Sequence, residues 1–255
     1  MKIRLTGKNL QDIRPLLAKY GLEETDGTPD AVISHGGDGA MLGAIREYPG
    51  LPIFPVRDAG TAPLCEEHPY EVRLAALRKN EFARTFLPMV AGEVNGKTIY
   101  GVNDVFLHHA DLSSALRYRV MIDGELYANE VVGDGVGIAS IHGSTAYYRS
   151  ITHSLFRVGI GLAFSNSTEE VNHLVLNGKS EILIEIVRGP GVLVADNSPE
   201  RITVREGDVI KFFQTEKTAE LWGLCDFMCP KCRVLRHPNK LPFRGFFCAD
   251  GCSKK

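Results

Sequence analysis

Ala31-Val32-Ile33-Ser34-His35-Gly36-Gly37-Asp38-Gly39 is the stretch of sequence that decides the fold. Its first four residues form a short apolar run of the kind found in buried strands, and residues 40 to about 48 favour a helix. The glycines between them predict a tight turn whose backbone can approach a ligand without a Cβ in the way. The helix that follows would offer unpaired N–H groups and a positive dipole end, which suit a phosphate.

Asp38 is the chemically informative residue of this turn. A carboxylate beside a phosphate is unfavourable by charge alone, so it makes sense if it accepts a proton from an alcohol or helps to hold Mg²⁺. No Lys-Ser or Lys-Thr pair follows the glycines, and the turn is therefore not a P-loop. Taken alone, the four residues would also fit an ordinary strand-to-helix turn that Asp38 caps.

The sequence on either side of this stretch predicts α/β organisation. Residues 2–6 and 51–56 indicate strands, whereas residues 9–20 and 70–79 carry apolar side chains at helical spacing. Gly21 would end the first of these helices. Strands that alternate with helices favour a parallel sheet with helices on its faces.

From about residue 86 onward, short alternating strands predict a β-rich region, with Asn95-Gly96 and Asp123-Gly124 as hairpin turns. The expected strands cover residues 86–93, 97–100, 104–108, 117–122, 125–132, 176–187, 192–195, 201–204 and 209–215. We therefore predict an α/β N-terminal domain, a β-rich, β-sandwich-like C-terminal domain and a Cys-rich tail, at residues 1–85, 86–224 and 225–255.

The composition is typical of a soluble globular protein, with 44% hydrophobic and 24% charged residues among 255. The formal net charge of −2 gives no overall positive field, so we expect neither a nucleic-acid nor a membrane partner. No run approaches the roughly 20 apolar residues that span a bilayer, and the N-terminus lacks a signal-peptide pattern. These observations predict a cytoplasmic protein.

A second group of polar and small residues lies about a hundred residues after the first glycine turn. Gly133-Asp134-Gly135 precedes Gly143-Ser144-Thr145-Ala146-Tyr147, a run of small, hydroxyl and aromatic side chains suited to a ribose and a base. Asn103-Asp104 lies between the two glycine turns and offers donors and acceptors to a nucleotide. Each of these elements alone also fits a hairpin turn or a strand end, but the three together favour a nucleotide site.

In this order, the turn at Gly36–Gly39, the pair Asn103-Asp104, and Gly133–Gly135 followed by Gly143–Tyr147 resemble the motifs of the NAD kinase family. The resemblance extends from about residue 30 to about residue 222. It implies a two-domain enzyme that works as a homodimer or homotetramer, with its active site between the domains. With Mg²⁺, such an enzyme moves a phosphoryl group from ATP, another nucleoside triphosphate or polyphosphate to the adenosine 2′-hydroxyl of NAD, which gives NADP.

The resemblance also implies roles for individual residues. Asp38 would be the catalytic base that faces the 2′-hydroxyl. This role agrees with the chemistry, because a ribose hydroxyl is a poor nucleophile until a group within hydrogen-bond reach takes its proton. The residues that would approach the phosphates are Gly36, Gly37 and Gly39, and those that would bind NAD are Asn103, Asp104, Asp134, His142, Thr145, Ala146 and Tyr147.

The chain departs from the family pattern near the expected substrate walls. Ala40 stands where the family has Thr, His142 where it has Thr or Ser, and Asp104 where it has Glu, while residues 148–153 replace a Gly-Gly-Pro element. Two alternatives follow: a phosphotransferase of the same superfamily that acts on another nucleoside or polyol, and a non-catalytic nucleotide-binding sensor. Retention of Asp38 argues against the sensor, because a binder gains little from a carboxylate beside a phosphate.

Four of the five cysteines in the tail form two close pairs, Cys229-Pro230-Lys231-Cys232 and Cys248-Ala249-Asp250-Gly251-Cys252. A C-x-x-C pair can place two thiolates on one tetrahedral ion, and a second close pair completes a four-ligand site. The sequence therefore predicts a structural Zn²⁺ in a zinc ribbon, held by Cys229, Cys232, Cys248 and Cys252. Unliganded thiols and a redox pair are the alternatives.

Overall fold

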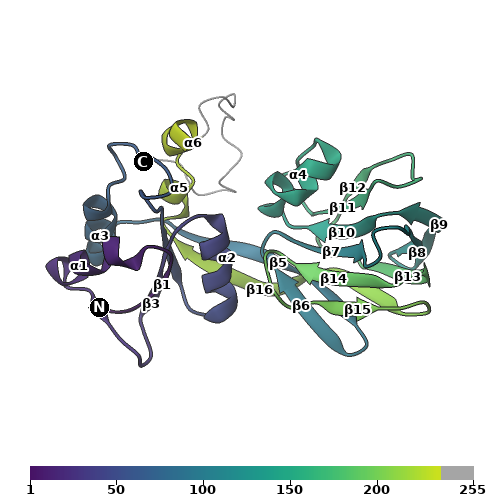
Figure 1. Cartoon of the computed structure of the whole chain (residues 1–255), viewed down its shortest axis with the longest axis horizontal. Helices are drawn as coiled ribbons and strands as arrows, with labels where there is room; N and C mark the ends of the chain where they lie inside the picture. The colour runs from purple at the N-terminus through teal and green to yellow at the C-terminus, as the bar shows by residue number, and fades with distance from the viewer. Residues whose placement is uncertain (237–255) are drawn as a thin grey trace. The chain divides into compact units, whose positions relative to one another are not determined.

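The computed structural model describes residues 1–236, which divide into two compact units (Figure 1). The first unit contains Met1–Leu87 and the described residues from Ala219 onward, and the second contains Pro88–Thr218. The chain passes between the units in β5 (Arg84–Val94) and β16 (Val209–Trp222). The prediction of an α/β part followed by a β-rich part is confirmed.

The first unit is built on a parallel sheet in the order β2-β1-β3-β4, which the end of β16 extends through the pairing of Leu221 with Ile53. The strands are β1 (Lys2–Gly7), β2 (Glu23–Glu24), β3 (Ala31–His35) and β4 (Ile53–Val56). The helices are η1 (Leu10–Asp12), α1 (Arg14–Leu17), η2 (Ala18–Tyr20), α2 (Asp38–Glu47), α3 (Tyr70–Lys79), α5 (Leu224–Phe227) and α6 (Pro230–Arg236).

Helix predictions in this unit had mixed outcomes. The helix expected at residues 70–79 is confirmed as α3. The prediction of a single helix at residues 9–20 is wrong, because the segment forms three short helices, η1, α1 and η2. Pro15 lies in the first turn of α1 and has no N–H to continue a helix from the preceding residues. The described part of the tail is also helical, in α5 and α6, whereas a zinc ribbon would be built of strands.

The second unit contains two groups of strands that enclose one apolar core. One sheet has the order β12-β11-β10-β7-β14-β15, and the other group contains β16-β13-β8-β9 together with the hairpin β5–β6. Alternate residues of β8 and β13 are buried, as expected for strands with one face on a core. The further elements are β6 (Lys97–Gly101), β7 (Asp104–His109), β8 (Leu116–Ile122), β9 (Glu125–Gly133), β10 (Gly135–Ala139), η3 (Gly143–Thr145), α4 (Tyr147–Thr152), β11 (Ile160–Ser165), β12 (His173–Leu176), β13 (Ile182–Arg188), β14 (Gly191–Ala195) and β15 (Ile202–Val204).

Both hairpin turns predicted in this unit are confirmed. Asn95 and Gly96 have φ values of 51° and 72°, and Asp123 and Gly124 have 52° and 83°, which is the left-handed backbone that two-residue hairpins require. The continuous strand expected at residues 176–187 is wrong. A turn that begins at Asn177 separates β12 from β13. The carbonyl of Asn177 accepts a hydrogen bond from the N–H of Ser180.

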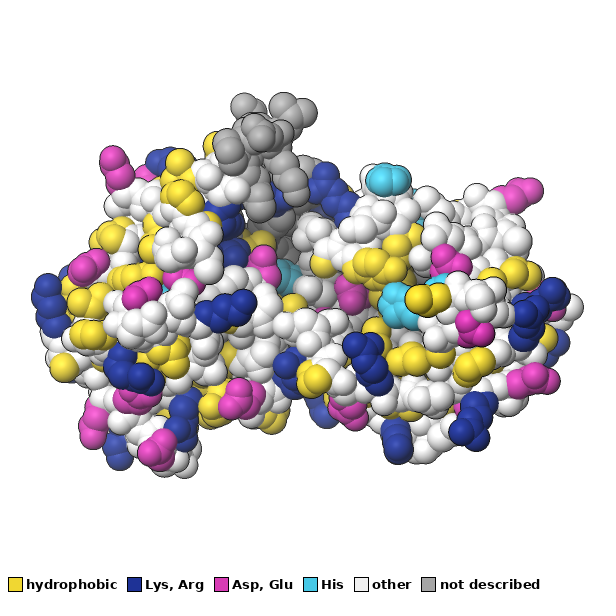
Figure 2. Space-filling view, in the orientation of Figure 1, with side chains coloured by type: hydrophobic (Ala, Val, Ile, Leu, Met, Phe, Trp, Pro, Cys, Tyr) yellow, Lys and Arg dark blue, Asp and Glu magenta, His cyan; other side chains and the backbone are white. Residues whose placement is uncertain are grey.

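The surface carries mixed charge. Figure 2 shows Lys and Arg side chains interspersed with Asp and Glu on the face in view, as a net charge of −2 would suggest. Among the described residues, no helix is long and apolar enough to cross a bilayer.

Candidate functional site

The glycine turn joins β3 to α2 and presents Asp38 in the first turn of the helix. Gly36 has a φ of 149°, which disfavours a side chain, and a Cβ there would lie 2.7 Å from the Cβ of Ala40. The N–H of Gly36 donates to the carbonyl of Val56 at 2.9 Å, which ties the turn to the neighbouring strand. The turn therefore has the strand-to-helix geometry that the sequence predicts.

A buried histidine fixes the strand end just before the turn. The ring of His35 is fully buried, with Nδ1 2.6 Å from the carbonyl oxygen of Lys8 and Nε2 3.1 Å from the hydroxyl of Tyr70. The same hydroxyl accepts a hydrogen bond from the N–H of Ala59 at 2.8 Å. These bonds connect β3, the start of α3 and the loop after β4, so they hold the turn from two sides.

Arg57 holds the Asp38 carboxylate. An Nη2 of Arg57 lies 3.0 Å from Oδ1 of Asp38, whose side chain is 62% exposed, while the Arg57 side chain is only 10% exposed. The Nε of Arg57 donates to the carbonyl of Phe227 at 3.0 Å, and the guanidinium lies 3.6 Å from the centre of the Phe227 ring. Burial lowers the pKa of Arg57, and the negative charge of Asp38 opposes this shift. Asp38 is thus an accessible carboxylate in a fixed position.

Two of the predicted NAD-binding residues, Asn103 and Asp104, have their backbone fixed in the second unit. The carboxylate of Asp196 accepts hydrogen bonds from the backbone N–H groups of Val102, Asn103 and Asp104, at 2.8, 2.7 and 3.1 Å. The carbonyl of Asn103 accepts the N–H of Ser140, and it also lies where a Cβ on Gly143 would have to go. The Asn103-Asp104 pair and the Gly143 turn therefore form one compact feature.

Asp104 is the titratable group most altered by this environment. It is 8% exposed at the start of β7. Burial raises its pKa to about 7, the Asp196 carboxylate adds to the shift, and the backbone N–H of Tyr147 opposes it. Near neutral pH the side chain is therefore divided between a donor and an acceptor form.

We expect this pKa to appear in the stability of the protein. Between about pH 4 and pH 7 the folded state holds a proton that the unfolded chain has released, so the free energy of unfolding falls as the pH rises through this window. Asp104→Asn should remove this part of the pH dependence. The free energy of unfolding of the variant and the wild type can be measured with denaturant at pH 5 and at pH 8. The difference, variant minus wild type, should be larger at pH 8 than at pH 5. A difference that does not change with pH would contradict the assignment.

Tyr147 begins α4 directly after the Gly143–Thr145 turn. Its ring meets Phe106 edge to face, with centroids 4.9 Å apart, and it is 39% exposed. The hydroxyl of Thr145 donates to the carbonyl of His142 at 3.3 Å and so closes the turn. An anchored, half-open aromatic ring of this kind can stack on a nucleobase.

Asp134 lies at the far end of β10 from Asp104. Ala139 pairs with Asp104 and Gly135 pairs with His108, so about 17 Å of strand separates the backbone positions of the two aspartates. Asn166 donates to Asp134 at 2.8 Å. Asn166 and Tyr147 also line a cleft of about 560 Å³, whose other lining residues are Ser150, Ile151, His153, Phe164, Ser165, Ser167, Glu169 and Asn172.

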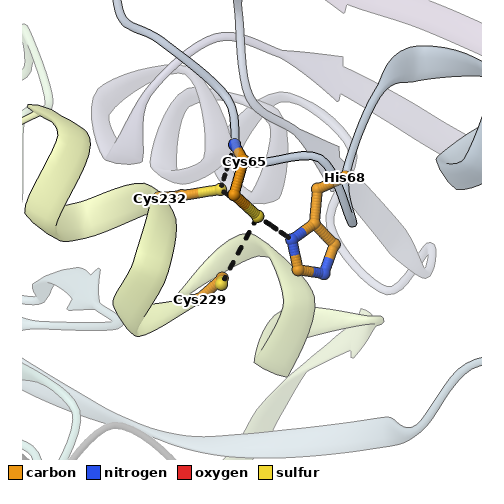
Figure 3. Close-up of side chains that lie close together, drawn as sticks. All are labelled: Cys65, His68, Cys229 and Cys232. Carbon is orange, nitrogen blue, oxygen red and sulfur yellow. Dashed lines mark hydrogen bonds between the residues drawn. The ribbon is translucent and has the colours of Figure 1, made fainter.

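A cluster of potential metal ligands occupies another part of the first unit. The side chains of Cys65, His68, Cys229 and Cys232 point toward one another (Figure 3), and their ligand atoms all lie within 4.8 Å of one another. Cys229 and Cys232 were predicted as zinc ligands, and the other two predicted ligands, Cys248 and Cys252, lie outside the described residues.

Sequence reasoning missed Cys65 and His68. The only local signal is their C-x-x-H spacing, which matches the C-x-x-C spacing of Cys229 and Cys232. It also missed Arg57 as the partner of Asp38 and Asp196 as the acceptor for three backbone N–H groups. The predicted phosphate-binding residues lie in the first unit, whereas the predicted NAD-binding residues lie in the second.

The sequence of this chain is similar to those of several proteins named NAD kinase. No protein-family model matches the chain. The chain is 24% identical to the NAD kinase of Sulfurisphaera tokodaii, with 97% of this chain and 100% of that protein aligned. It is 32% identical to the NAD kinase of Marinobacter nauticus over 62% of this chain and 58% of that protein, and 30% identical to NAD kinases of Saccharolobus islandicus over 57% of each. Apart from the Sulfurisphaera protein, the matches thus span little more than half of these relatives.

Solved structures give the same answer for the fold. An NAD kinase from Archaeoglobus fulgidus in complex with ATP has a TM-score of 0.72 at 18% identity, with 89% of this chain and 96% of that chain covered. Yeast NADH kinase complexed with NADH has a TM-score of 0.72 at 16% identity, with 89% and 84% covered. The chain shares the fold of these two proteins, with an α/β part and a β-rich part. In sequence and in fold, the chain is therefore similar to proteins named NAD kinase.

Proposed function

We propose that this chain is a kinase that transfers a phosphoryl group from ATP to the adenosine 2′-hydroxyl of NAD, giving NADP. The observation that carries the proposal is the carboxylate of Asp38, exposed in the first turn of α2 directly after the glycine turn. The relatives named NAD kinase and the related structures with ATP and with NADH support the same substrates.

Asp38 would act as the general base. As the bond to phosphorus forms, its carboxylate takes the proton of the 2′-hydroxyl, which makes that oxygen a better nucleophile. The ion pair with Arg57 keeps the side chain of Asp38 in one orientation. The activation free energy therefore includes a smaller entropic cost for orienting the base.

The phosphates of the donor fit the start of α2. Gly36, Gly37 and Gly39 carry no side chains there, and the N-terminal end of a helix attracts negative charge. Mg²⁺ bound to the triphosphate would neutralise part of its charge.

The second unit would bind NAD. The anchored pair Asn103 and Asp104 would read the adenosine, and the half-open ring of Tyr147, with Thr145 and Ala146 beside it, would line the adenine pocket. His142 begins the same turn, and Asp134 would contact the nicotinamide end. The separation of Asp104 and Asp134 along β10 suits an extended dinucleotide better than a single nucleoside. By the same family resemblance, we propose a dimer or tetramer, which light scattering would test.

One assay decides between this proposal and its alternatives. The purified protein is incubated with ATP, Mg²⁺ and NAD, and NADP is detected with a dehydrogenase that accepts only NADP. Polyphosphate in place of ATP tests the second donor. Tight NAD binding without NADP formation would identify a sensor.

The lining of the cleft in the second unit supports an alternative phosphoryl acceptor. Ser150, Ile151 and His153 belong to the segment that replaces the family's Gly-Gly-Pro element, and all three line the cleft of the second unit. Polar side chains at this position can change which substrate the cleft accepts. The assay should therefore compare NAD with NADH and with free nucleosides. A higher kcat/KM for a nucleoside would favour the alternative phosphotransferase.

A further inference from the structure

The four-residue cluster in the first unit has the dimensions of a metal site. Tetrahedral zinc binds sulfur at about 2.3 Å and imidazole nitrogen at about 2.0 Å, which places neighbouring ligand atoms about 3.5 to 3.8 Å apart. Sγ of Cys65 lies 3.3 Å from Sγ of Cys232 and 3.9 Å from Sγ of Cys229. Nδ1 of His68 lies 3.0 Å from Sγ of Cys65 and 3.8 Å from Sγ of Cys232.

The surroundings of His68 also fit a metal ligand. Nδ1 faces the sulfurs, and Nε2 on the other side of the ring lies 3.6 Å from Oδ1 of Asp226. Metal-bound histidines commonly direct their second ring nitrogen to a carboxylate, which fixes the ring and its tautomer. Asp226 is held in turn by the buried Arg73, whose Nη2 also donates to the carbonyl of Gly223 at 3.1 Å.

The charge balance suits a site with three thiolates. One Zn²⁺ with three thiolates and a neutral imidazole carries a net charge of −1. The guanidinium groups of the buried Arg73 and of Arg57, whose side chain is 10% exposed, interact favourably with the charge of Cys232. Cys229 and Cys232 are themselves buried, and three sulfurs with one nitrogen at these distances match the Cys₃His sites of structural zinc.

We propose that Cys65, His68, Cys229 and Cys232 bind one Zn²⁺, and that this ion positions Arg57 against Asp38. Cys229 is the next residue but one after Phe227, whose carbonyl and ring hold Arg57, and Sδ of Met228 lies 3.6 Å from the same guanidinium. Anchoring Cys229 therefore fixes the backbone on which Arg57 rests. This second part depends on the proposed function, whereas the metal site does not.

The ligand set is tested by metal analysis of the full-length chain, purified without a histidine tag. The wild type should contain one zinc per chain, Cys65→Ser and His68→Ala should lose it, and Cys248→Ser and Cys252→Ser should keep it. Zinc that stays in the first two variants, or that is lost from all four, overturns the assignment. A metal-free wild type with a disulfide or with free thiols at Cys65 and Cys232 also overturns it.

A second measurement covers the case in which a variant fails to fold. Cobalt exchanged into the wild type should give the visible bands of a tetrahedral ion and a sulfur-to-metal charge-transfer band for three thiolates. His68→Cys should still bind one ion, because four cysteines also form structural zinc sites, and the charge-transfer band should grow by about a third. An unchanged band shows that position 68 is not a ligand and rejects the site.

The coupling to Asp38 is tested by a double-mutant cycle on kcat per folded molecule. If the ion acts through Arg57, His68→Ala should lower kcat in the wild-type background and have little further effect in Arg57→Ala. Additive effects would overturn the positioning role. If the chain makes no NADP at all, the metal content and the cobalt spectrum still decide the site, so failure of the two proposals can be told apart.

Discussion

Asp38→Asn should abolish most of the turnover while leaving NAD binding nearly intact. The amide cannot accept the proton of the 2′-hydroxyl, and general-base catalysis typically contributes about 10²- to 10⁴-fold, so we expect kcat to fall within this range. The substitution keeps the size of the side chain and an oxygen that can still face Arg57, which limits its structural effect. Steady-state kinetics of NADP formation and calorimetric titration with NAD measure the two quantities separately.

A matched acid-to-amide change in the same unit provides the control. Asp26 forms an ion pair with Arg4 and is fully exposed, so Asp26→Asn should change the stability little and leave kcat unchanged. If Asp38→Asn lowered kcat no more than Asp26→Asn, Asp38 would not be the base. A parallel loss of NAD affinity in Asp38→Asn would instead show that the carboxylate acts in binding.

Gly143→Ala should damage the second unit more than a single methyl group would suggest. The Cβ would overlap the backbone carbonyl of Asn103, which cannot move freely because the neighbouring N–H groups are held by Asp196. Overpacking of this kind costs about 1–3 kcal/mol, and here the strain falls on the contact that joins two predicted NAD-binding elements. We expect a lower thermal midpoint, by about 5 °C, together with weaker NAD binding.

Gly178→Ala is the matched control in the same unit. A Cβ at position 178 would approach only the end of the Gln214 side chain, at 3.1 Å, and that side chain can move aside. Its thermal midpoint and NAD affinity should stay close to those of the wild type. If Gly143→Ala behaved like Gly178→Ala in calorimetry and in NAD titration, the close approach of Asn103 to Gly143 would contribute neither to stability nor to NAD binding.

The parts of this molecule that could be predicted from the sequence are those decided by neighbouring residues. The α3 helix, the Asn95-Gly96 hairpin and the strand, turn and helix around Asp38 all follow from local pattern and turn chemistry. The helix expected at residues 9–20 was wrong because apolar spacing was given more weight than Pro15.

The features that escaped prediction depend on residues far apart in the chain. Cys65 and Cys229 are 164 positions apart, and a cysteine outside the tail gave no reason to join the tail's metal motif. Asp196 lies 93 positions from Asn103, and an isolated aspartate in a turn has no recognisable pattern. Arg57 reaches Phe227 across 170 positions. Only the folded backbone shows which of many polar residues meet.

The route of the chain through the two units has a consequence for synthesis on the ribosome. The second unit is one uninterrupted stretch, whereas the first is assembled from both ends of the sequence. All parts of the β-rich unit therefore emerge before the strand residue Leu221 and the helices α5 and α6, which complete the α/β unit. Domains generally fold as units during translation. We therefore expect the second unit to reach its native state first, and the N-terminal strands to complete their sheet only after Leu221 has been synthesised.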